Sequence, residues 1–427
     1  MEHLLFAAYL VLFAWLTTKI KFFTETGLTN PQLVIIFFIK VMAGIFYGWI
    51  GVYYGSLAQM VDTWGFHYNS IIETNLLKSD PKEFVTSFFN NPYESGYGKF
   101  FSSEDSWWND LDLNFFIKFL ALLNVASFGH YYINLIFFSF ITLFGTIAFY
   151  RVMQDVFPEK KLTVLLATVL LPSFLYWTGG IHKDGIVFLA IAFIVYHIYF
   201  GLKNRKFTVA GILMIIFPLL LILVLRNYLL ILLLPALLAW ILSKKLPYRP
   251  VAVFAGLYLL FTILFFSVGY IHPKLDFPKA VVNKQQAFLL LSGGSAVTVK
   301  ELQPNFKSFL LNAPEAASLA FIRPYPSDVK HLLALAAAAE INLLLLLFVI
   351  FLFWKNNGVS LSPFLLFCIF FAFTTLLTIG YTVNFLGAIV RYRSIVLPFL
   401  VVPMLAKIDW KRIGFILLPN ITFKNNK

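Results

Sequence analysis

Two aspartates lie where an apolar stretch of the chain meets polar residues, and a carboxylate in that position could accept a proton or bind a cation. Asp62 follows the apolar run 41–61, and Asp184 directly precedes the run 185–201. The ionisation of an acid at the edge of a low-dielectric region is sensitive to its neighbours. The pair predicts a general base with a supporting partner, or two ligands of a divalent cation. Alternatively, Asp184 is only a first-turn residue of the helix that follows it.

Four basic residues occupy short connections where insertion into a membrane does not explain them: Lys183, Arg226, Arg391 and Arg393. A guanidinium group binds phosphate oxygens through two parallel hydrogen bonds, which suits a lipid-phosphate substrate. On a helix, Arg391 and Arg393 would diverge by about 200°, whereas on an extended segment they would share a face. The sequence does not decide which of them reaches a ligand. The alternative for each basic residue is contact with phospholipid headgroups.

Other residue types add less to this picture. His182 and Tyr68 lie close in sequence to the two aspartates and are candidate wall residues of the same site. The histidines show no spacing typical of metal ligands, and there is no phosphate-binding loop of the kind that ATP-driven pumps use. The sequence therefore requires no cofactor, and it leaves open whether a divalent cation binds.

Helices that cross a membrane must position these residues. The chain has 427 residues, of which 60% are hydrophobic and 12% charged, and its mean hydropathy is +0.82. A bilayer core about 30 Å thick needs roughly 20 apolar residues in a helix. An all-α integral membrane protein with about eleven spans, in a range of roughly 10 to 13, is therefore expected. The runs lie at 4–18, 41–61, 131–150, 162–178, 185–201, 207–225, 228–242, 250–270, 331–354, 361–380 and 394–406.

The basic residues set the expected orientation. The net charge is +13, but the positive residues cluster between apolar runs, so they indicate cytoplasmic connections and not nucleic-acid binding. Lys40 is expected at the cytoplasmic end of its span, which leaves Glu340 as the one charge inside an apolar run. The stretch 113–127 is assigned to the outer surface as an interfacial helix, because a further span there would invert the later positive-inside pattern.

The chain is accordingly expected to form one membrane domain, 1–427, with two long outer segments at 62–130 and 271–330. The second segment is expected to cap the site or bind an acceptor. The first apolar run lacks a basic region ahead of it and a cleavage site after it, so it is interpreted as an uncleaved span. The single cysteine, Cys368, excludes a disulfide within the chain.

Two short motifs carry a resemblance to known families. The segment Trp177 to Asp184 and the segment Arg323-Pro324-Tyr325-Pro326 resemble those of uncharacterised bacterial membrane proteins. The arrangement of the whole chain resembles the GT-C superfamily of polytopic glycosyltransferases, which includes protein mannosyltransferases and aminoarabinose transferases. In that superfamily an acid follows a span in the first outer loop, which Asp62, followed by Tyr68, matches. Many members have paired acids there, whereas Thr63 follows Asp62 in this chain.

The resemblance also implies roles for the later residues. A second acid of the superfamily stands at the start of a later helix, as Asp184 does, and a basic residue near the last outer loops contacts the donor phosphate, as Arg391 or Arg393 would. Asp62 would then be the base and Asp184 its partner or a metal ligand. His182, Lys183 and Arg226 would line the wall of the site.

The implied activity is transfer of a sugar from a polyprenyl-phosphate or polyprenyl-diphosphate donor to an acceptor hydroxyl. The expected partners are the lipid-linked donor, a glycan, lipid or protein acceptor, and membrane lipids. The expected location is the bacterial cytoplasmic membrane, with the site on the outer face and a role in cell-envelope polysaccharide.

Three alternatives are kept. An O-antigen polymerase or ligase would depend on the arginines more than on Asp62. A flippase or transporter for a lipid-linked sugar would place several charges inside spans. A structural assembly component would have no catalysis.

Overall fold

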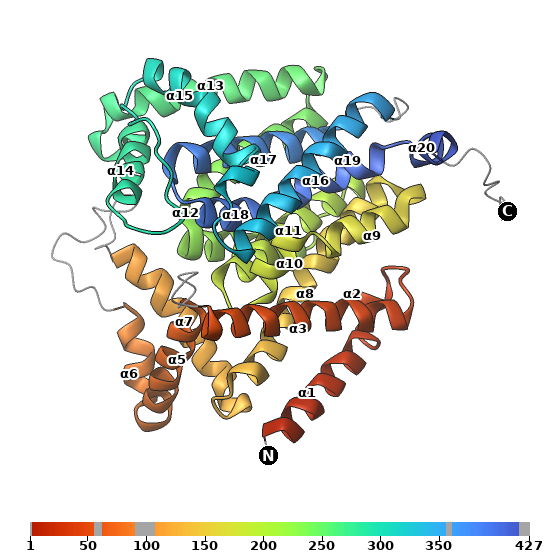
Figure 1. Cartoon of the computed structure of the whole chain (residues 1–427), viewed down its shortest axis with the longest axis vertical. Coiled ribbons are helices and arrows are strands. Elements are labelled where there is room, and N and C mark those ends of the chain that lie inside the picture. The colour runs from red at the N-terminus through yellow and green to blue at the C-terminus, as the bar shows by residue number, and fades with distance from the viewer. Residues whose placement is uncertain (1, 55–61, 90–106, 356–360, 418–427) are drawn as a thin grey trace.

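The computed structural model describes residues 2–54, 62–89, 107–355 and 361–417, and Figure 1 shows a bundle of helices of very different lengths. In this part of the chain, seven helices are long and apolar enough to cross a membrane, or up to nine if each of two bent helix pairs is one span. The expected all-helical membrane architecture is confirmed. The end of the run expected at 41–61 lies outside the described residues.

The first half of the bundle contains the helices that lead to the two aspartates. Its elements are α1 (Glu2–Thr17), α2 (Lys21–Thr24), α3 (Asn30–Tyr53), α5 (Asp62–Ser79), α6 (Pro81–Thr86), α7 (Trp107–Ser127), α8 (Tyr131–Val156), α9 (Lys161–Val169), α10 (Pro172–Gly179) and α11 (Lys183–Lys203). Helices α8 and α11 pack closely against each other and form the centre of the core.

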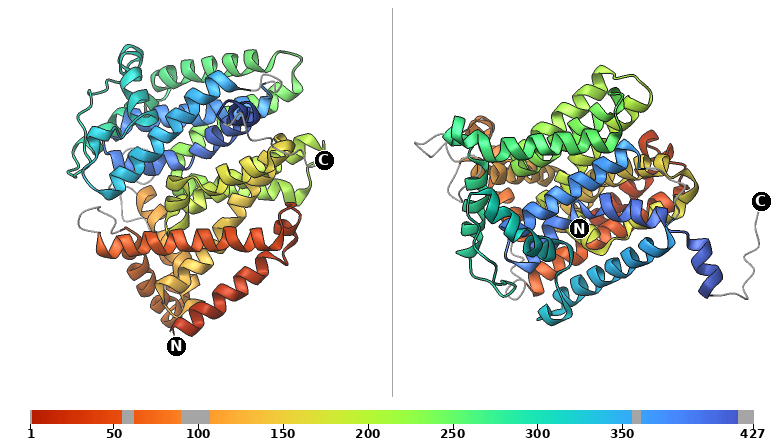
Figure 2. Two further views of the ribbon diagram at one scale, coloured as in Figure 1. Left: turned by 45° about the vertical axis from the view of Figure 1, so that its right-hand side comes forward. Right: turned by 90° about the horizontal axis from the view of Figure 1, so that it is seen from above.

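The second half surrounds that centre. It consists of α12 (Val209–Lys245), α13 (Pro250–Ile271), α14 (Phe277–Leu289), α15 (Phe306–Phe321), α16 (Leu332–Trp354), α17 (Pro363–Thr382), α18 (Leu386–Ser394), α19 (Leu397–Lys407) and α20 (Trp410–Leu417). Helices α13 and α16 expose most of their apolar side chains and lie at the edge of the bundle (Figure 2). These exposed faces are suited to contact with lipid.

Helix α3 begins earlier than the sequence analysis expects. Thr29 caps it by accepting a hydrogen bond from the Gln32 amide, and the Gln32 side chain accepts one from the Thr29 amide in return. The helix then runs through Lys40, whose side chain is 3% exposed. The expectation that Lys40 ends a span is wrong, because the residue lies inside α3.

Helix α12 reverses direction at Arg226, where the backbone leaves helical geometry with φ −155° and ψ 66°. Near the start of α12, a Cβ on Gly211 would lie 3.7 Å from Nδ1 of His197 in α11. Near the end of α12, the ring of Trp240 lies 6.4 Å, centroid to centroid, from the ring of Tyr199 in α11. Both ends of α12 therefore lie beside one end of α11. A straight helix would hold Gly211 and Trp240 about 44 Å apart at 1.5 Å per residue. The expected pair of runs, 207–225 and 228–242, agrees with this reversal.

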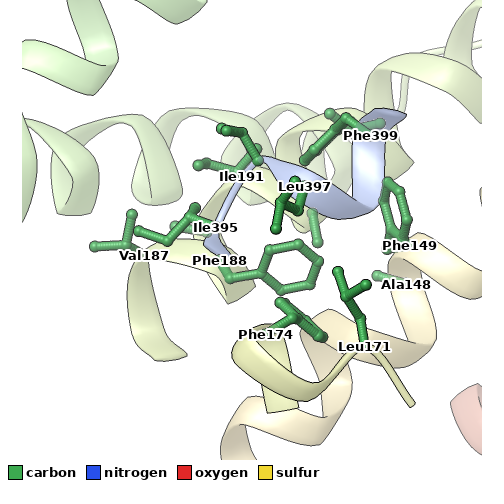
Figure 3. Packing of buried hydrophobic residues seen from close by; sticks show 14 of the residues in the cluster. Ala148, Phe149, Leu171, Phe174, Val187, Phe188, Ile191, Ile395, Leu397 and Phe399 are labelled. Atoms are coloured by element: carbon green, nitrogen blue, oxygen red, sulfur yellow. The ribbon is translucent and has the colours of Figure 1, made fainter. Parts of the chain in front are cut away.

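Two pairs of short helices are bent, and their breaks meet in the core. Helices α9 and α10 join at 57°, and α18 and α19 join at 65°. Figure 3 shows that Leu171, at the first break, and Ile395, at the second, both lie close to Phe188 of α11. The ring of Phe188 also lies 4.5 Å from that of Phe174, centroid to centroid. The run expected at 394–406 is thus only the second half of a helix pair that begins at Leu386.

The first long segment, 62–130, contains a packed pair of helices, α5 and α7. Lys118 of α7 forms a mostly buried ion pair of 2.7 Å with Glu73 of α5. Six residues further along α7, the Asn124 amide donates to the hydroxyls of Ser70 and Thr74. These contacts satisfy the Lys118 ammonium group and the Asn124 amide within the protein. The position of α7 at the outer membrane surface stays a prediction.

The second long segment, 271–330, contains α14 and α15 and is attached to the start of α18. The Val297 amide donates to the Asn384 carbonyl at 2.8 Å, and the Leu386 amide donates to the Ser295 carbonyl at 3.0 Å. The extended chain of this segment therefore holds the first residues of α18, the helix that carries Arg391.

Candidate functional site

Asp184 is the centre of a group of charged residues that come from distant parts of the sequence. Its side chain is 0% exposed. One carboxylate oxygen, Oδ1, accepts a hydrogen bond from Nη2 of Arg226 at 3.1 Å, and Oδ2 accepts one from Nε of Arg391 at 2.9 Å. Two guanidinium groups thus compensate a carboxylate that would otherwise be very costly to bury. Asp184 is in the first turn of α11, as one sequence interpretation expects, and it also orients both arginines.

His182, in the turn between α10 and α11, completes the buried side of the group. Burial lowers the pKa of His182 to about 4, and the positive charge of Arg391 acts in the same direction. The imidazole is therefore neutral at pH 7. Its Nε2 faces Nη2 of Arg391, and its Nδ1 accepts a hydrogen bond from the Asp184 amide at 3.2 Å and lies 3.0 Å from Oδ2 of Asp184. His182 thus connects the acid to the arginine.

Asp62 is the accessible acid of the group. Its side chain is 50% exposed, and its Oδ2 lies 3.3 Å from Nη1 of Arg391. Arg391 therefore joins a buried carboxylate to an exposed one through different nitrogens of a single guanidinium group. Since Asp184 is enclosed by its partners, Asp62 is the better placed of the two aspartates to act on a bound molecule.

Lys183 has a partner that sequence reasoning missed. Its Nζ forms a hydrogen-bonded ion pair with Oδ1 of Asp112, which belongs to α7 and lies 71 residues away in sequence. Lys183 thus pairs with an acid distant in sequence and not with the adjacent Asp184. No periodicity or motif marks Asp112, because its role depends on how α7 packs. The pair brings the first long segment to the edge of the group.

Aromatic rings surround the two arginines. The guanidinium carbon of Arg391 lies 5.6 Å from the ring centroid of Trp177 and 5.5 Å from that of Tyr392. The guanidinium carbon of Arg226 lies 5.1 Å from the Tyr392 ring. Such cation–π contacts restrain a guanidinium group at low cost in desolvation. Trp177 opens the motif that carries the family resemblance, whereas nothing in the sequence marks Tyr392.

Two of the expected site residues lie elsewhere. Since α18 is helical, Arg391 and Arg393 point in different directions, and this decides between the two alternatives for the Arg391–Arg393 segment. Arg393 is fully buried and its Nη1 donates to the carbonyls of Ala320 and Arg323. Tyr68 is 60% exposed, and its ring lies beside those of Trp64 and His67. Arg391 is therefore the candidate for phosphate contact.

Glycines allow α3 to approach the turn that carries His182. A Cβ on Gly180 would lie 2.2 Å from the ring of Tyr47, and a Cβ on Gly44 would lie 2.5 Å from the Gly179 carbonyl oxygen. Both distances are below van der Waals contact, so a larger residue would push α3 and the turn apart. Packing thus explains Gly180 of the motif and Gly44 of α3.

We call the six charged residues described above the site cluster: Asp62, Asp112, Lys183, Asp184, Arg226 and Arg391. It contains three acids and three cations, with neutral His182 beside them. The described part of the chain has no group of three or more histidine, cysteine or acidic residues that could hold a metal ion. In this structure Asp62 and Asp184 face guanidinium groups.

Comparisons with protein-family models, curated proteins and solved structures find no match for this chain. The functional argument therefore depends on the geometry of the site cluster and on the chemistry of its residues.

Proposed function

We propose that the protein is a membrane glycosyltransferase that moves a sugar from a polyprenyl-phosphate or polyprenyl-diphosphate donor to an acceptor hydroxyl. We also propose that the site faces the outer side of the bacterial cytoplasmic membrane. One observation carries the proposal: Arg226 and Arg391 converge on one buried acid, and Arg391 also pairs with an accessible acid, Asp62. This arrangement offers a phosphate-binding group next to a base.

In the proposed reaction, the donor phosphate takes the position on Arg391 that Asp62 occupies in this structure. The acceptor oxygen bonds to the anomeric carbon of the sugar as the bond from that carbon to the phosphate oxygen breaks. Asp62, displaced from Arg391, takes the proton of the acceptor hydroxyl. Arg391, supported by Arg226, stabilises the negative charge on the departing phosphate. Asp184 and His182 hold Arg391 in place and do not touch the substrate.

A polymerase or ligase acting on lipid-linked glycans is the second candidate. It is favoured by the full burial of Asp184, which leaves the half-exposed Asp62, paired with Arg391, as the accessible one of the two aspartates. A reaction driven mainly by guanidinium groups would need no base at Asp62.

The test compares purified variants in lipid vesicles for donor binding and for sugar transfer. Asp62→Asn keeps the size of the side chain but removes its basicity, so transfer should fall by roughly 10²- to 10⁴-fold with donor binding retained. Arg391→Ala should weaken donor binding. Arg391→Lys should restore only part of it, because a point charge lacks the two-pronged geometry of arginine.

Asp155→Asn is a matched control, since Asp155 pairs with the exposed Lys203 at the far end of α11. It should leave binding and transfer unchanged. Normal transfer by Asp62→Asn together with loss in Arg391→Ala would favour the polymerase or ligase. Normal activity in all variants would exclude the site cluster as the catalytic site.

A further inference from the structure

Two charged residues inside membrane spans, Lys40 of α3 and Glu340 of α16, are explained by neither the site cluster nor membrane insertion. Their side chains are 3% and 7% exposed. Ionisable groups at such positions mark ion or substrate pathways by default. In this protein, however, both side chains contact α10, the eight-residue half-helix of a bent helix pair.

Glu340 contacts the first turn of α10. Its Oε1 accepts hydrogen bonds from the backbone amide of Ser173 at 3.0 Å and from the Ser173 hydroxyl at 3.1 Å. Leu171, the residue just before α10, has no side-chain acceptor, and Pro172, the first residue of α10, has no amide hydrogen. Glu340 therefore supplies from α16 the cap that α10 cannot supply itself.

Lys40 contacts the last turn of the same half-helix. Its Nζ donates to the Thr178 carbonyl at 3.1 Å and lies 3.4 Å from the Thr178 hydroxyl. That carbonyl is one of the last four of α10, which have no partner within the helix. A cation at the C-terminus and an anion at the N-terminus are both favourable with respect to the helix dipole. The signs of the two charges thus match the two ends of α10.

We propose that Lys40 and Glu340 are positioning residues that hold α10 by its two ends and thereby fix the turn that carries His182 into the site cluster. A helix of eight residues is too short to be stable by itself. Trp177, beside Arg391, belongs to α10, and His182 lies three residues after Gly179, the last residue of α10. Loosening either end would therefore move both groups that contact Arg391 from this side.

The experiment uses the full-length protein in lipid nanodiscs and measures amide hydrogen exchange over residues 172–182. Lys40→Met and Glu340→Leu should each raise exchange there by roughly tenfold, because each removes a capping charge. Exchange in residues 186–200 of α11 should stay unchanged. Glu340→Gln keeps both acceptor bonds without the charge and should give an intermediate increase, and Lys40→Arg should behave like the unmodified protein.

Two further variants make the test specific. The exchanged pair, Lys40→Glu with Glu340→Lys, should not restore protection, because each charge would then face the wrong end of the dipole. Asn342→Leu is the control on α16, since the Asn342 amide bonds only to the Ala338 carbonyl of its own helix in the described structure. It should leave exchange in α10 unchanged.

The proposal is overturned by unchanged exchange in folded Lys40→Met and Glu340→Gln, or by restored protection in the exchanged pair. It is also overturned if vesicles containing the protein conduct protons or ions and Lys40→Met abolishes that flux. Weaker binding of a polyprenyl-phosphate sugar by these variants is the one expectation that rests on the proposed function. If the unmodified protein binds no such donor, the proposed function fails, while the exchange result still decides the role of Lys40 and Glu340.

Discussion

Replacing Asp184 with asparagine keeps the shape of the side chain but leaves the mostly buried Arg226 without a carboxylate and Arg391 with Asp62 alone. In the structure Asp184 binds Arg226 at 3.1 Å and Arg391 at 2.9 Å, and its own side chain is 0% exposed. Removing one partner of a buried ion pair costs about 3–5 kcal/mol, because the remaining charge stays in a low-dielectric environment. We expect Asp184→Asn to lower the free energy of unfolding by about that amount.

The same substitution at Asp62 should behave differently. Its carboxylate is 50% exposed, and the pair with Arg391 is 3.3 Å long. Exposed ion pairs contribute about 0–1 kcal/mol, so Asp62→Asn should change stability by less than about 1 kcal/mol. The two isosteric substitutions thus separate the acid that holds the site cluster together from the acid that is available for chemistry.

Denaturant unfolding of both variants in one detergent measures these differences, with Asp155→Asn as the control for a partly exposed pair. A double substitution of Asp184 and Arg391 should cost less than the sum of the single substitutions, because the two groups interact directly. A loss below about 1 kcal/mol for Asp184→Asn would refute the reasoning, since an exposed pair alone costs no more than that. Equal losses for Asp184→Asn and Asp62→Asn would do the same.

Further predictions concern topology, packing and pH. In a Cys368→Ser background, a membrane-impermeant thiol reagent should label Tyr68→Cys from outside and should not label Asn204→Cys; equal labelling of both would contradict the orientation. Gly180→Ala should reduce both thermal stability and donor binding, because its Cβ would lie 2.2 Å from a tyrosine ring; an unchanged melting temperature would contradict the close packing. Because burial lowers the pKa of His182 from 6.5 to about 4, the unfolded chain binds more protons between these values. The free energy of unfolding should therefore fall as the pH decreases from about 6.5 to 4. In His182→Gln, the free energy of unfolding should depend less on pH over this range.

The lengths and places of most long helices could be predicted from the sequence, because an apolar run long enough to cross a bilayer has few alternatives. The runs at 250–270 and 331–354 correspond to α13 (Pro250–Ile271) and α16 (Leu332–Trp354) within a residue at each end. The start of α3 was missed because Lys40 was interpreted as an end signal. The Lys40 side chain donates to the Thr178 carbonyl, which lies 138 residues away in sequence.

The site was only partly predictable for the same reason. Asp62, Asp184, Arg226 and Arg391 could be grouped as charges in connections between spans, and the structure brings them together. Arg393 has the same local sequence pattern as Arg391, and only the helical geometry of α18 separates them. Asp112 and Tyr392 take part through tertiary contacts, which no motif in a single sequence records.

The sequence separations within the site cluster also bear on how the protein is made. Arg226 lies 42 residues from Asp184, whereas Arg391 lies 207 residues from it and 329 from Asp62. During synthesis, α11 and the first half of α12 leave the translocon long before α18 does. Asp184 and Arg226 are thus both synthesised before Arg391. A chain that ends after α12 therefore contains every residue of the site cluster except Arg391, the residue that joins Asp184 to Asp62.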